Sequence, residues 1–485
     1  MKTGDATEFS LRSVRRRLLS GSAWVFGAKI ASLMLGIVVQ GILARLLTKS
    51  EYGVYTSAFT LSLMGAAIAQ MGLDRAVVRF VAGAIGLHQT GRARSAIRIA
   101  LTYGSLAAVA LGTILALGPG QWLARTVFNS PDLARVMPLV AGWLIATALQ
   151  SLIVESFRGM SRFAASTLLD AFFVDIVSAT AFALVYALAH NAGPQLVIGI
   201  AAGATGLAAA VGGVMLLQRL RSLDGPGETN RGEMFHVAWP LMVTNLAILL
   251  LGSGVDVLVL NAFRSEATVG LYGASARLVV FVATPFAVFS GVIPPIIAEL
   301  HTKGKMRQLE RALRAGATLA GLPAFVMLLI FVLFGPWVLT TVYGPQYAEG
   351  ASILAILSIG RLVAVWAGSA GITLMMTGNQ KAMMKVTLMS GLVSVAAGIV
   401  GAYYYGAIGV ACATTAAQIL QNSIQLTLVR RRLGIWTMIH FDPRELWRYL
   451  RPGGGRGAAE EAAESVAEVL VEPDEPSEGD DPQDD

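Results

Sequence analysis

The sequence predicts an all-α polytopic membrane protein of about twelve transmembrane helices, in two six-helix lobes related by a pseudo-two-fold axis along the membrane normal. The first observation is composition: 55% of the residues are hydrophobic and 14% are charged, whereas soluble domains carry about 25% charged residues. The second is a series of apolar stretches of about 20 residues, the length that crosses a bilayer. The third is an internal repeat at offsets of 215 and 217 residues.

Twelve apolar stretches follow one another along the chain. They lie near 18–44, 52–73, 98–118, 134–154, 163–189, 195–217, 234–260, 268–297, 313–338, 348–375, 383–402 and 406–429. The second, eighth and tenth stretches are rich in glycine or interrupted by polar residues. The longest external connection, about 119–133, leaves no room for a catalytic domain outside the membrane.

Basic residues set the orientation, because Lys and Arg resist translocation. If the N-terminus is cytoplasmic, internal segments hold 29 of the 37 basic residues. The external loops then hold five: Arg45, Lys49, Arg125, Arg135 and Arg264. Both termini are therefore predicted to lie in the cytoplasm, with the chain crossing the cell membrane many times.

The spans and the charges together divide the chain. We expect a basic cytoplasmic N-terminus (1–17), an N-terminal lobe (18–217), a cytoplasmic linker (218–233), a C-terminal lobe (234–429) and a cytoplasmic tail (430–485). The first apolar stretch is too long for a signal-peptide core and is expected to remain as a span. The tail is basic at first and then acidic, with twelve acidic residues from Glu460 onward, and it is predicted to be disordered.

Several classes of protein are excluded or disfavoured. The single cysteine, Cys412, gives no disulfide framework and no thiolate metal site. The chain has no G-x-x-x-x-G-K-[ST], H-E-x-x-H or G-x-S-x-G motif, so neither ATP hydrolysis nor a metal or other cofactor is expected. Anionic lipid headgroups account for the basic loops beside the spans, so nucleic acid is not an expected partner.

The repeat consists of two pairs of segments. "GQWLARTVFN" at 120–129 resembles "GPWVLTTVYG" at 335–344, and "KSEYGVYTSA" at 49–58 resembles "SEATVGLYGASA" at 265–276, with Gly53 paired with Gly270 at the offset of 217. Both pairs fall at external ends of equivalent spans, which indicates a six-plus-six duplication with both copies the same way up. This topology is typical of alternating-access transporters with the substrate path between the halves. The alternative is an ancestral duplication kept only as a scaffold.

Three cations fall inside predicted spans: Lys29, Arg277 and Arg361. On a helix, Ser22, Gly36 and Gln40 lie within about 20° of Lys29. A charge at mid-bilayer costs at least ~2.5 kcal/mol, so this polar stripe is expected to face a watery cavity. The alternative is a lysine paired with a carboxylate for structure alone.

Arg277 and Arg361 lie within the eighth and tenth spans. Arg presents a planar fork suited to phosphate oxygens, and Lys presents a point charge. Three buried cations on three helices therefore predict an anionic ligand.

Carboxylates also lie within the spans, and they leave two alternatives open. Asp170 and Asp175 are five residues apart, about 140° around a helix, so they cannot both face one site. Asp256 lies toward the outer end of the seventh span. Each of the three either pairs with a cation or binds a coupling proton or sodium ion. Glu155 and Arg158, three residues apart, are expected to form a local pair.

The twelfth span carries a stripe of neutral polar residues on one side of its inner half. Its members are Thr414, Gln418, Gln421, Asn422 and Gln425. Such groups suit sugar hydroxyls, and they equally suit hydrogen bonds between helices.

The segment from 20 to 83 contains three motifs: "GSAW", "LARLLTKSEYGVY" across the first external turn and "GLDRAVVRF" at the inner end of the second span. Through these motifs it resembles the opening two helices of the Wzx-type oligosaccharide flippases. These are polysaccharide biosynthesis exporters of the multidrug/oligosaccharidyl-lipid/polysaccharide superfamily.

The resemblance implies a flippase, rather than an enzyme, that moves polyprenyl-diphosphate-linked oligosaccharides from the inner to the outer leaflet for surface polysaccharide biosynthesis. The cations would hold the diphosphate, and the polar stripes, Gln40 included, would face the sugars. Lys29 matches a cationic position of the family's first helix; Arg277 and Arg361 are assigned from position alone. Glycosyltransferases and a polymerase of the same pathway are the implied partners.

Four alternatives are weighed against this interpretation. Lipid II flippases belong to the same superfamily but often carry two further helices, and its multidrug exporters depend on carboxylates in their cavities. A major-facilitator transporter would show a long central loop and a G-x-x-x-D-R-x-G-R-R pattern. A membrane glycosyltransferase or polymerase, the enzyme alternative, would need acidic residues at an external face and a larger external loop.

Overall fold

The computed structural model describes residues 31–189, 192–223, 225, 227–250, 252–290 and 293–439. These residues form helices and the turns between them, with no β-strand in the described ranges. Lys29, the segment 1–17 and the tail beyond residue 439 lie outside them. The structure therefore bears out an all-α chain.

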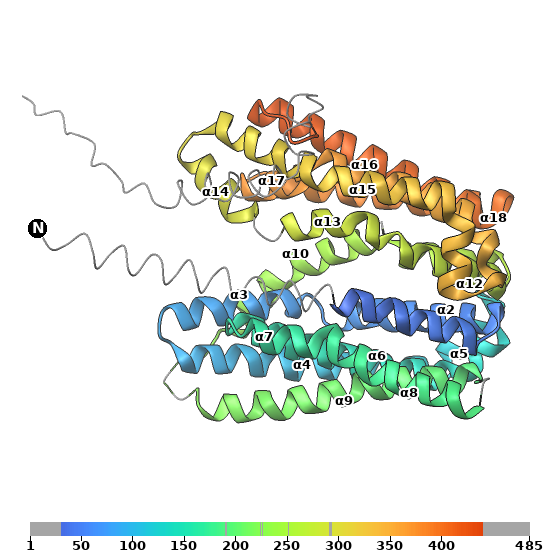
Figure 1. Ribbon diagram of the computed structural model, residues 1–485. Coiled ribbons are helices and arrows are strands. Elements are labelled where there is room, and N and C mark those ends of the chain that lie inside the picture. Colours follow the sequence, from blue (N-terminus) through green and yellow to red (C-terminus); the bar gives the residue numbers. More distant parts are fainter. Residues whose placement is uncertain are drawn as a thin grey trace, which may run out of the picture. The chain divides into compact units, whose positions relative to one another are not determined.

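The helices follow one another closely, as Figure 1 shows. After a helix at Ala31–Leu46, the first half of the chain forms α2 (Lys49–Ala69), α3 (Leu73–Gly86), α4 (Thr90–Ala116), α5 (Pro119–Thr126), α6 (Pro131–Gly159), α7 (Phe163–Thr167), the π-helical η1 (Leu168–Phe172), α8 (Phe173–Ala189) and α9 (Pro194–Arg221). The second half forms α10 (Arg231–Leu250), α11 (Ser253–Phe263), α12 (Glu266–Leu278), α13 (Val280–Ser290), α14 (Ile293–Thr302), α15 (Met306–Tyr343), the 3-10 helix η2 (Pro345–Gly350), α16 (Ala351–Ala367), α17 (Ala370–Met376) and α18 (Gln380–Leu433).

Nine helices in the described part of the chain are long and apolar enough to cross a membrane, or ten if α10 and α11 form one bent span. The 54 residues of α18 contain a reversal at Gly406, whose φ is 63° and ψ is −138°. Gly401 and Gly409 meet backbone to backbone across it, since a Cβ on Gly401 would lie 2.6 Å from the carbonyl carbon of Gly409. The chain is thus a multi-pass membrane protein, and the count of twelve spans stays a prediction.

Local sequence explains where the helices begin. Thr48 and Glu51 form a capping box at the start of α2: the Thr48 hydroxyl accepts from the Glu51 N–H, and the Glu51 carboxylate accepts from the Thr48 N–H. Ser130 caps α6 by accepting from the Leu133 N–H at 3.1 Å. Both caps lie at the end of the helices that the charge pattern predicts to be external.

Two residues with left-handed backbone conformation separate α2 from α3. Met71 and Gly72 have φ values of 49° and 75°, and a Cβ on Gly72 would lie 2.2 Å from the Ala238 carbonyl oxygen. Glycine is needed here because the turn and the close approach both exclude a side chain. The basic segment after the second predicted span continues as α3, whose Leu73, Val77 and Val81 are buried.

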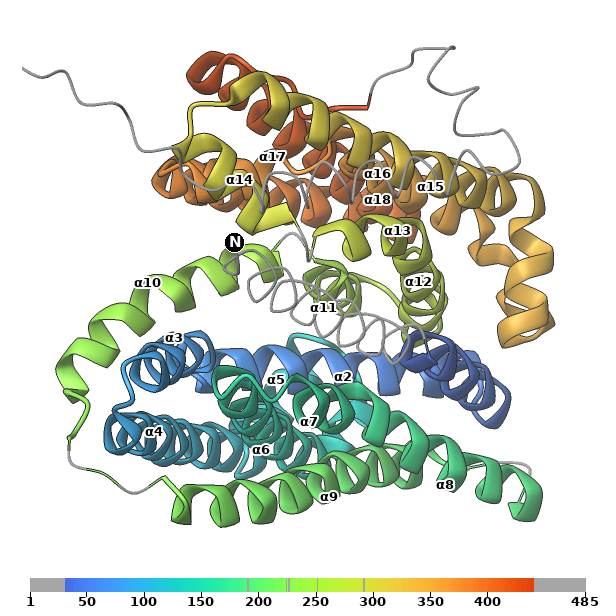
Figure 2. The same ribbon diagram turned by 60° about the vertical axis from the view of Figure 1, so that its left-hand side comes forward.

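Contacts divide the described chain into two compact units. The first contains the described residues up to Ala283, with Phe325–Val363 and Met384–Gln421. Within it α2, α4 and α9 pack around α6 (Figures 1 and 2). Their core is formed by small and branched side chains, among them Ala100, Leu152 and Phe157.

The second unit contains Thr284–Ala324, Ala364–Met383 and the residues from Asn422 onward. Its core joins α14, the start of α15, α17 and the end of α18 through Ile297, Leu313 and Leu374. The predicted lobes at 18–217 and 234–429, with the linker at 218–233, concern the repeated topology rather than this contact pattern. That division and the symmetry axis stay predictions.

Candidate functional site

Arg277 lies near the middle of the candidate span Glu266–Ala287. Its guanidinium carbon sits 4.5 Å from the centroid of the Phe59 ring, a cation–π contact that fixes the plane of the fork. The guanidinium interacts electrostatically with Asp175 and with three tyrosines, Tyr52, Tyr55 and Tyr343. A cation in such a place is suited to bind an anion.

The Gln40 side chain belongs to a tyrosine cluster. Gln40 is buried, and its Oε1 accepts a hydrogen bond from the Tyr52 hydroxyl at 2.9 Å. The Tyr52 ring packs edge-on against Tyr343 and Tyr347, with centroids 6.2 Å and 5.6 Å away. This contact joins α2 to residues about 300 positions later, and it gives Gln40 a structural partner.

Arg361 is grouped with Asp256. The buried Asp256 carboxylate accepts hydrogen bonds from the Tyr272 hydroxyl and from the Thr414 hydroxyl, the latter at 2.8 Å. Arg361 interacts electrostatically with Asp256 and Tyr272. The tertiary structure thus brings together one predicted cation, one predicted carboxylate and one member of the polar stripe.

The other two carboxylates have different partners. Asp175 accepts a hydrogen bond from Ser32 at 2.9 Å and interacts electrostatically with Arg277. Asp170 is exposed, and its Oδ2 lies 3.7 Å from an Arg158 guanidinium nitrogen. Asp170 lies within the π-helical segment η1, where its ψ of −106° departs from helical geometry.

The polar stripe of the twelfth span is used in part for helix packing. Gln421 donates to the Thr387 hydroxyl at 3.2 Å. Gln418 lies against Gly360 and the buried Gln425 lies against Gly371, where a Cβ on each glycine would approach the amide oxygen to 3.2 Å and 3.1 Å. Asn422 is half-buried. Gln421 thus makes a hydrogen bond of the interhelical kind, and a role in sugar binding stays a prediction for the whole stripe.

Lys29 lies outside the described residues. Among the predicted site residues in the described ranges, Asp256 interacts electrostatically with Arg361, and Asp175 with Arg277. A cavity shared by all three cations stays a prediction.

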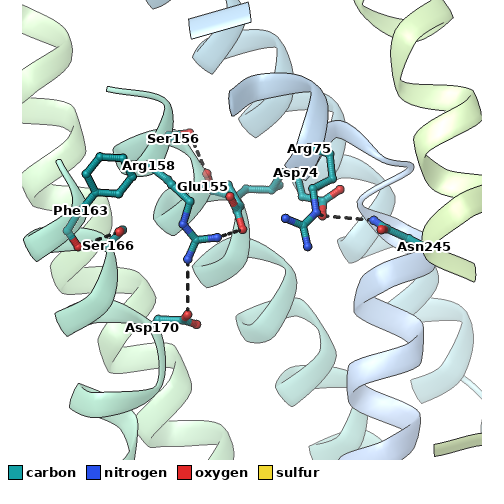
Figure 3. Close-up of polar contacts among 10 residues, drawn as sticks. Asp74, Arg75, Glu155, Ser156, Arg158, Phe163, Ser166, Asp170 and Asn245 are labelled. Atoms are coloured by element: carbon teal, nitrogen blue, oxygen red, sulfur yellow. Dashed lines mark hydrogen bonds and ion pairs between the residues drawn. The ribbon is translucent and has the colours of Figure 1, made fainter. Parts of the chain in front are cut away.

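A polar network lies near the C-terminal end of α2, and the sequence predicted only one of its pairs, Glu155 with Arg158 (Figure 3). Arg158 donates to Glu155 and also approaches Asp170. Arg75 Nε lies 3.6 Å from the Asp74 Oδ2. Glu155 also interacts electrostatically with Asp74 and Arg75. Residues of α3, α6 and η1 therefore contribute to one network.

Asn245 extends this network to α10. Its Nδ2 donates to the Asp74 Oδ2, a contact drawn in Figure 3, and the two atoms are 3.4 Å apart. Spacing along the chain contained no signal for this contact, because Asp74 and Asn245 are far apart in sequence.

The two copies of the repeat meet at Gly53 and Gly270, the glycines that the sequence comparison paired. A Cβ on Gly53 would lie 1.9 Å from the Glu266 carbonyl oxygen, and a Cβ on Gly270 would lie 2.3 Å from the Lys49 carbonyl oxygen. Helices α2 and α12 therefore cross backbone to backbone at these glycines. The contact is reciprocal, since Lys49 and Glu266 also differ by 217 positions.

Glu266 connects three helices at this crossing. Its carboxylate accepts from the Ser50 hydroxyl at 2.7 Å and from the Ser130 hydroxyl. Ser130 caps α6 with the same oxygen, so one carboxylate fixes the starts of α2, α6 and α12. This role was not predicted, although Glu266 stands inside the repeated segment.

Further contacts between early and late residues surround the crossing. Lys49 Nζ lies 3.0 Å from the Glu349 carboxylate, and Arg45 donates to the Thr341 carbonyl oxygen at 2.9 Å. One helical turn after Gly53 in α2, the buried Ser57 hydroxyl accepts a hydrogen bond from the Asn261 side chain at 2.9 Å. In this unit, the first and second halves of the chain are joined at the predicted external end; we call these residues the Gly53 contact.

No group of three or more His, Cys, Asp or Glu side chains in the described ranges is arranged to hold a metal ion. The groups found at the candidate site are guanidinium ions, carboxylates, hydroxyls and amides. Such an arrangement can bind and release charged and polar groups.

Comparison with known proteins identifies relatives along most of the chain. A family model described as "Polysaccharide biosynthesis protein" matches residues 42–352. A probable flippase of Haloferax volcanii, AglR, is 25% identical over 363 residues, which cover 72% of this chain and 70% of that protein.

Solved structures show the same fold at low identity. An inward-facing MATE-family multidrug resistance transporter of the MOP superfamily has a TM-score of 0.69 and 14% identity, and the match covers 83% of this chain and 94% of that one. The lipid II flippase MurJ, in an inward closed conformation, has a TM-score of 0.66 and 12% identity over 93% and 94%. These relatives are transporters and flippases, not enzymes.

Proposed function

This chain belongs to the polysaccharide biosynthesis protein family, and from that premise we propose that it flips a polyprenyl-diphosphate-linked oligosaccharide from the cytoplasmic to the outer leaflet by alternating access. The flippase relative and the transporter fold support a membrane transporter acting on a lipid-linked substrate. The glycan, the carrier and the route belong to the proposal, as do the cell membrane and the cytoplasmic placement of both termini.

The observation that carries the proposal is Arg277, a guanidinium held within a span by an aromatic ring rather than by a close ion pair in the described residues. An arginine in hydrocarbon is costly, so a transporter is expected to keep one there for a ligand. A diphosphate offers several anionic oxygens in the geometry that the guanidinium fork matches. Arg361, and Lys29 by its position in the first span, would complete the binding set.

Alternating access is supported by the Gly53 contact. Glycines at equivalent positions of the two repeats form it, and Glu266 secures it with two hydroxyl partners. An outward-open state has to break this contact, since it closes the predicted external end between the two halves of the chain. The same contact would hold that end closed while substrate enters from the cytoplasmic side.

The carboxylates would serve as charge partners of the cations in this scheme. Asp256 has two hydroxyl donors and Arg361 nearby, and Asp175 has Ser32 and Arg277. Binding of a coupling proton or sodium ion at Asp170, Asp175 or Asp256 is the second part of the proposal. Neutral amides of the twelfth span, such as Gln418, Asn422 and Gln425, would face the sugars.

The test is a flipping assay with the purified full chain in proteoliposomes that contain a polyprenyl-diphosphate-linked oligosaccharide. We expect Arg277→Ala to lower the flipping rate by at least about tenfold, since a lost charge-assisted hydrogen bond costs about 1.5–3 kcal/mol. The flipping rate of Arg277→Lys should lie between those of Arg277→Ala and the unaltered protein, because lysine keeps the charge but lacks the planar guanidinium fork. Lys29→Ala should abolish flipping, and Lys29→Arg should be partly tolerated.

Arg219→Ala is the matched control, since it removes an exposed arginine at the end of α9. Equal rates for Arg277→Ala, Arg219→Ala and the unaltered protein would overturn the assignment of the cation. Transport of lipid II, or of a cationic dye at a rate that Arg277→Ala leaves unchanged, would instead indicate one of the other superfamily functions. Glycan transfer by the purified chain would indicate an enzyme.

A further inference from the structure

A cavity of about 500 Å³ lies between α4 and the segment that joins α9 to α10. This volume is in the range of small-molecule sites. The α4 wall is contributed by Gly91, Arg94, Ser95, Arg98, Ile99, Thr102 and Tyr103. The facing wall is contributed by Gly225, Gly227, Glu228, Thr229 and Arg231. Neither Arg277 nor Arg361 lines it, so it is separate from the proposed carrier site.

The facing wall is held in place by specific contacts. The buried Thr229 hydroxyl donates to the Arg92 carbonyl oxygen at 2.8 Å. Gly227 has a φ of 119°, and a Cβ there would lie 2.9 Å from the Arg92 Cγ. A Cβ on Gly225 would lie 2.7 Å from the Thr90 hydroxyl oxygen. Two glycines and one hydroxyl therefore fix this segment against the first turn of α4, and the cavity is a built feature.

The lining has the chemistry of an anion site. Arg94, Arg98 and Thr102 recur at every fourth position, so they stand on one face of α4. Arg231 faces them from the other wall, with its Nη1 3.4 Å from the Tyr103 hydroxyl. Three guanidinium groups and several hydroxyls are set against one carboxylate, that of Glu228. Guanidinium forks bind phosphate oxygens in pairs, and hydroxyls complete the hydrogen bonding.

The location of the cavity limits the class of ligand that can bind there. The cavity lies where α4 leaves its basic start and enters its apolar span. Arg98 and Arg231 are exposed, so a ligand can reach them. A phosphate at this level is either a membrane headgroup or a soluble molecule, and anionic headgroups are concentrated beside basic loops of this kind.

We propose that the cavity lined by Arg94, Arg98 and Arg231 binds a phosphate ester, carried by an anionic phospholipid headgroup or by a soluble molecule. The ligand bridges α4 and the segment leading into α10. When the ligand is bound, it therefore holds the segment that connects the two halves of the chain against α4, which belongs to the first half. This role does not depend on which substrate the protein transports.

The test is a binding titration of the purified full chain in detergent, read by native mass spectrometry. Phosphatidylglycerol and glycerol 3-phosphate are the two probes, one for the lipid headgroup and one for a soluble phosphate ester. We expect the double variant R98Q/R231Q to weaken binding of one probe by at least about tenfold, the factor that corresponds to about 1.4 kcal/mol. The probe that responds identifies the source.

R219Q/R221Q is the matched control, because it removes two exposed arginines from the end of α9, outside the cavity. It should change the affinity by less than about twofold, as expected for unspecific surface charge. The proposal is overturned if neither probe distinguishes R98Q/R231Q from the unaltered protein, or if the control loses as much affinity. Elution of each variant as a single species separates a binding defect from misfolding.

Discussion

The two ends of α2 are built on different physical principles. At the Gly53 contact, α2 and α12 cross with their backbones touching, and Glu266 is satisfied by Ser50 and Ser130. At the other end lies the polar network of Asp74, Glu155 and their arginines. Within the described residues, Asp74 Oδ1 and Glu155 Oε2 are buried without a hydrogen-bond partner.

The difference shows which changes each end tolerates. A backbone crossing has no room for any side chain, so it depends on shape. A network of buried charges retains its shape when a carboxylate becomes an amide, but it loses the electrostatic attraction that offsets desolvation. The stability of the Gly53 contact should therefore depend on side-chain size, and the stability of the polar network should depend on charge.

The largest effect is expected from Gly53→Leu. A Cβ would lie 1.9 Å from the Glu266 carbonyl oxygen, so α2 and α12 have to separate, at a cost of about 3 kcal/mol or more. Flipping should be lost, and a thiol placed at the predicted external end should become reactive with a membrane-impermeant reagent. Gly83→Leu is the control, because nothing lies within 4 Å of a Cβ placed on Gly83 in α3; equal loss in both variants would contradict a special crossing.

Glu266→Gln should have a smaller effect at the same end. The amide can accept from only one of the two serine hydroxyls that the carboxylate now binds. Losing a hydrogen bond to a charged group costs about 1.5–3 kcal/mol, so the external end should open more often while the protein still folds. Faster thiol labelling at this end is the measurement, and labelling at the unaltered rate would contradict the role of Glu266.

Glu155→Gln tests the polar network by charge at constant size. Arg158 would lose its closest carboxylate and keep Asp170 at 3.7 Å. Because the Arg158 side chain is 33% exposed, water compensates in part, and a loss of about 1–2 kcal/mol is expected.

The double variant Glu155→Gln/Arg158→Gln should be less destabilised than the sum of the two single variants, because it leaves no unpaired buried charge. The free energy of unfolding of the full chain in detergent is the measurement. Strict additivity would show that the pair does not act as one unit.

The smallest effect is expected from Glu349→Gln. This carboxylate pairs with Lys49 beside the Gly53 contact, but its side chain is 76% exposed. Exposed pairs of this kind contribute about 0.2–1 kcal/mol, so labelling and flipping should stay near the unaltered values. A loss as large as that of Glu266→Gln would show that surface charge, rather than the buried serine contacts, holds this end.

Much of the fold could be predicted because span length and apolarity are local properties. The apolar stretches near 134–154 and 195–217 correspond to α6 and α9. The paired glycines of the repeat, Gly53 and Gly270, also indicated equivalent positions. Their mutual contact was not foreseen, since similarity between two segments does not say that they touch.

The candidate site was less accessible to sequence reasoning. Periodicity placed Arg277 and Arg361 within helices, but only tertiary packing set Arg277 over Phe59 and Asp256 between Tyr272 and Thr414. The basic cavity was also missed, because its walls come from α4 and from a segment more than a hundred residues later. Arg94 and Arg98 were among the 29 basic residues of the internal segments and were given no further role.

The sequence by itself determined that this chain is a helical, multi-pass membrane protein of a transporter family, because hydrocarbon selects apolar helices of a fixed length wherever they stand in the chain. Only the tertiary structure decided the partners of the polar groups. Glu266 with Ser50 and Ser130, Asp74 with Asn245, and Arg231 with Tyr103 are contacts between distant segments. Helix packing fixes such contacts, and no spacing along one helix encodes them.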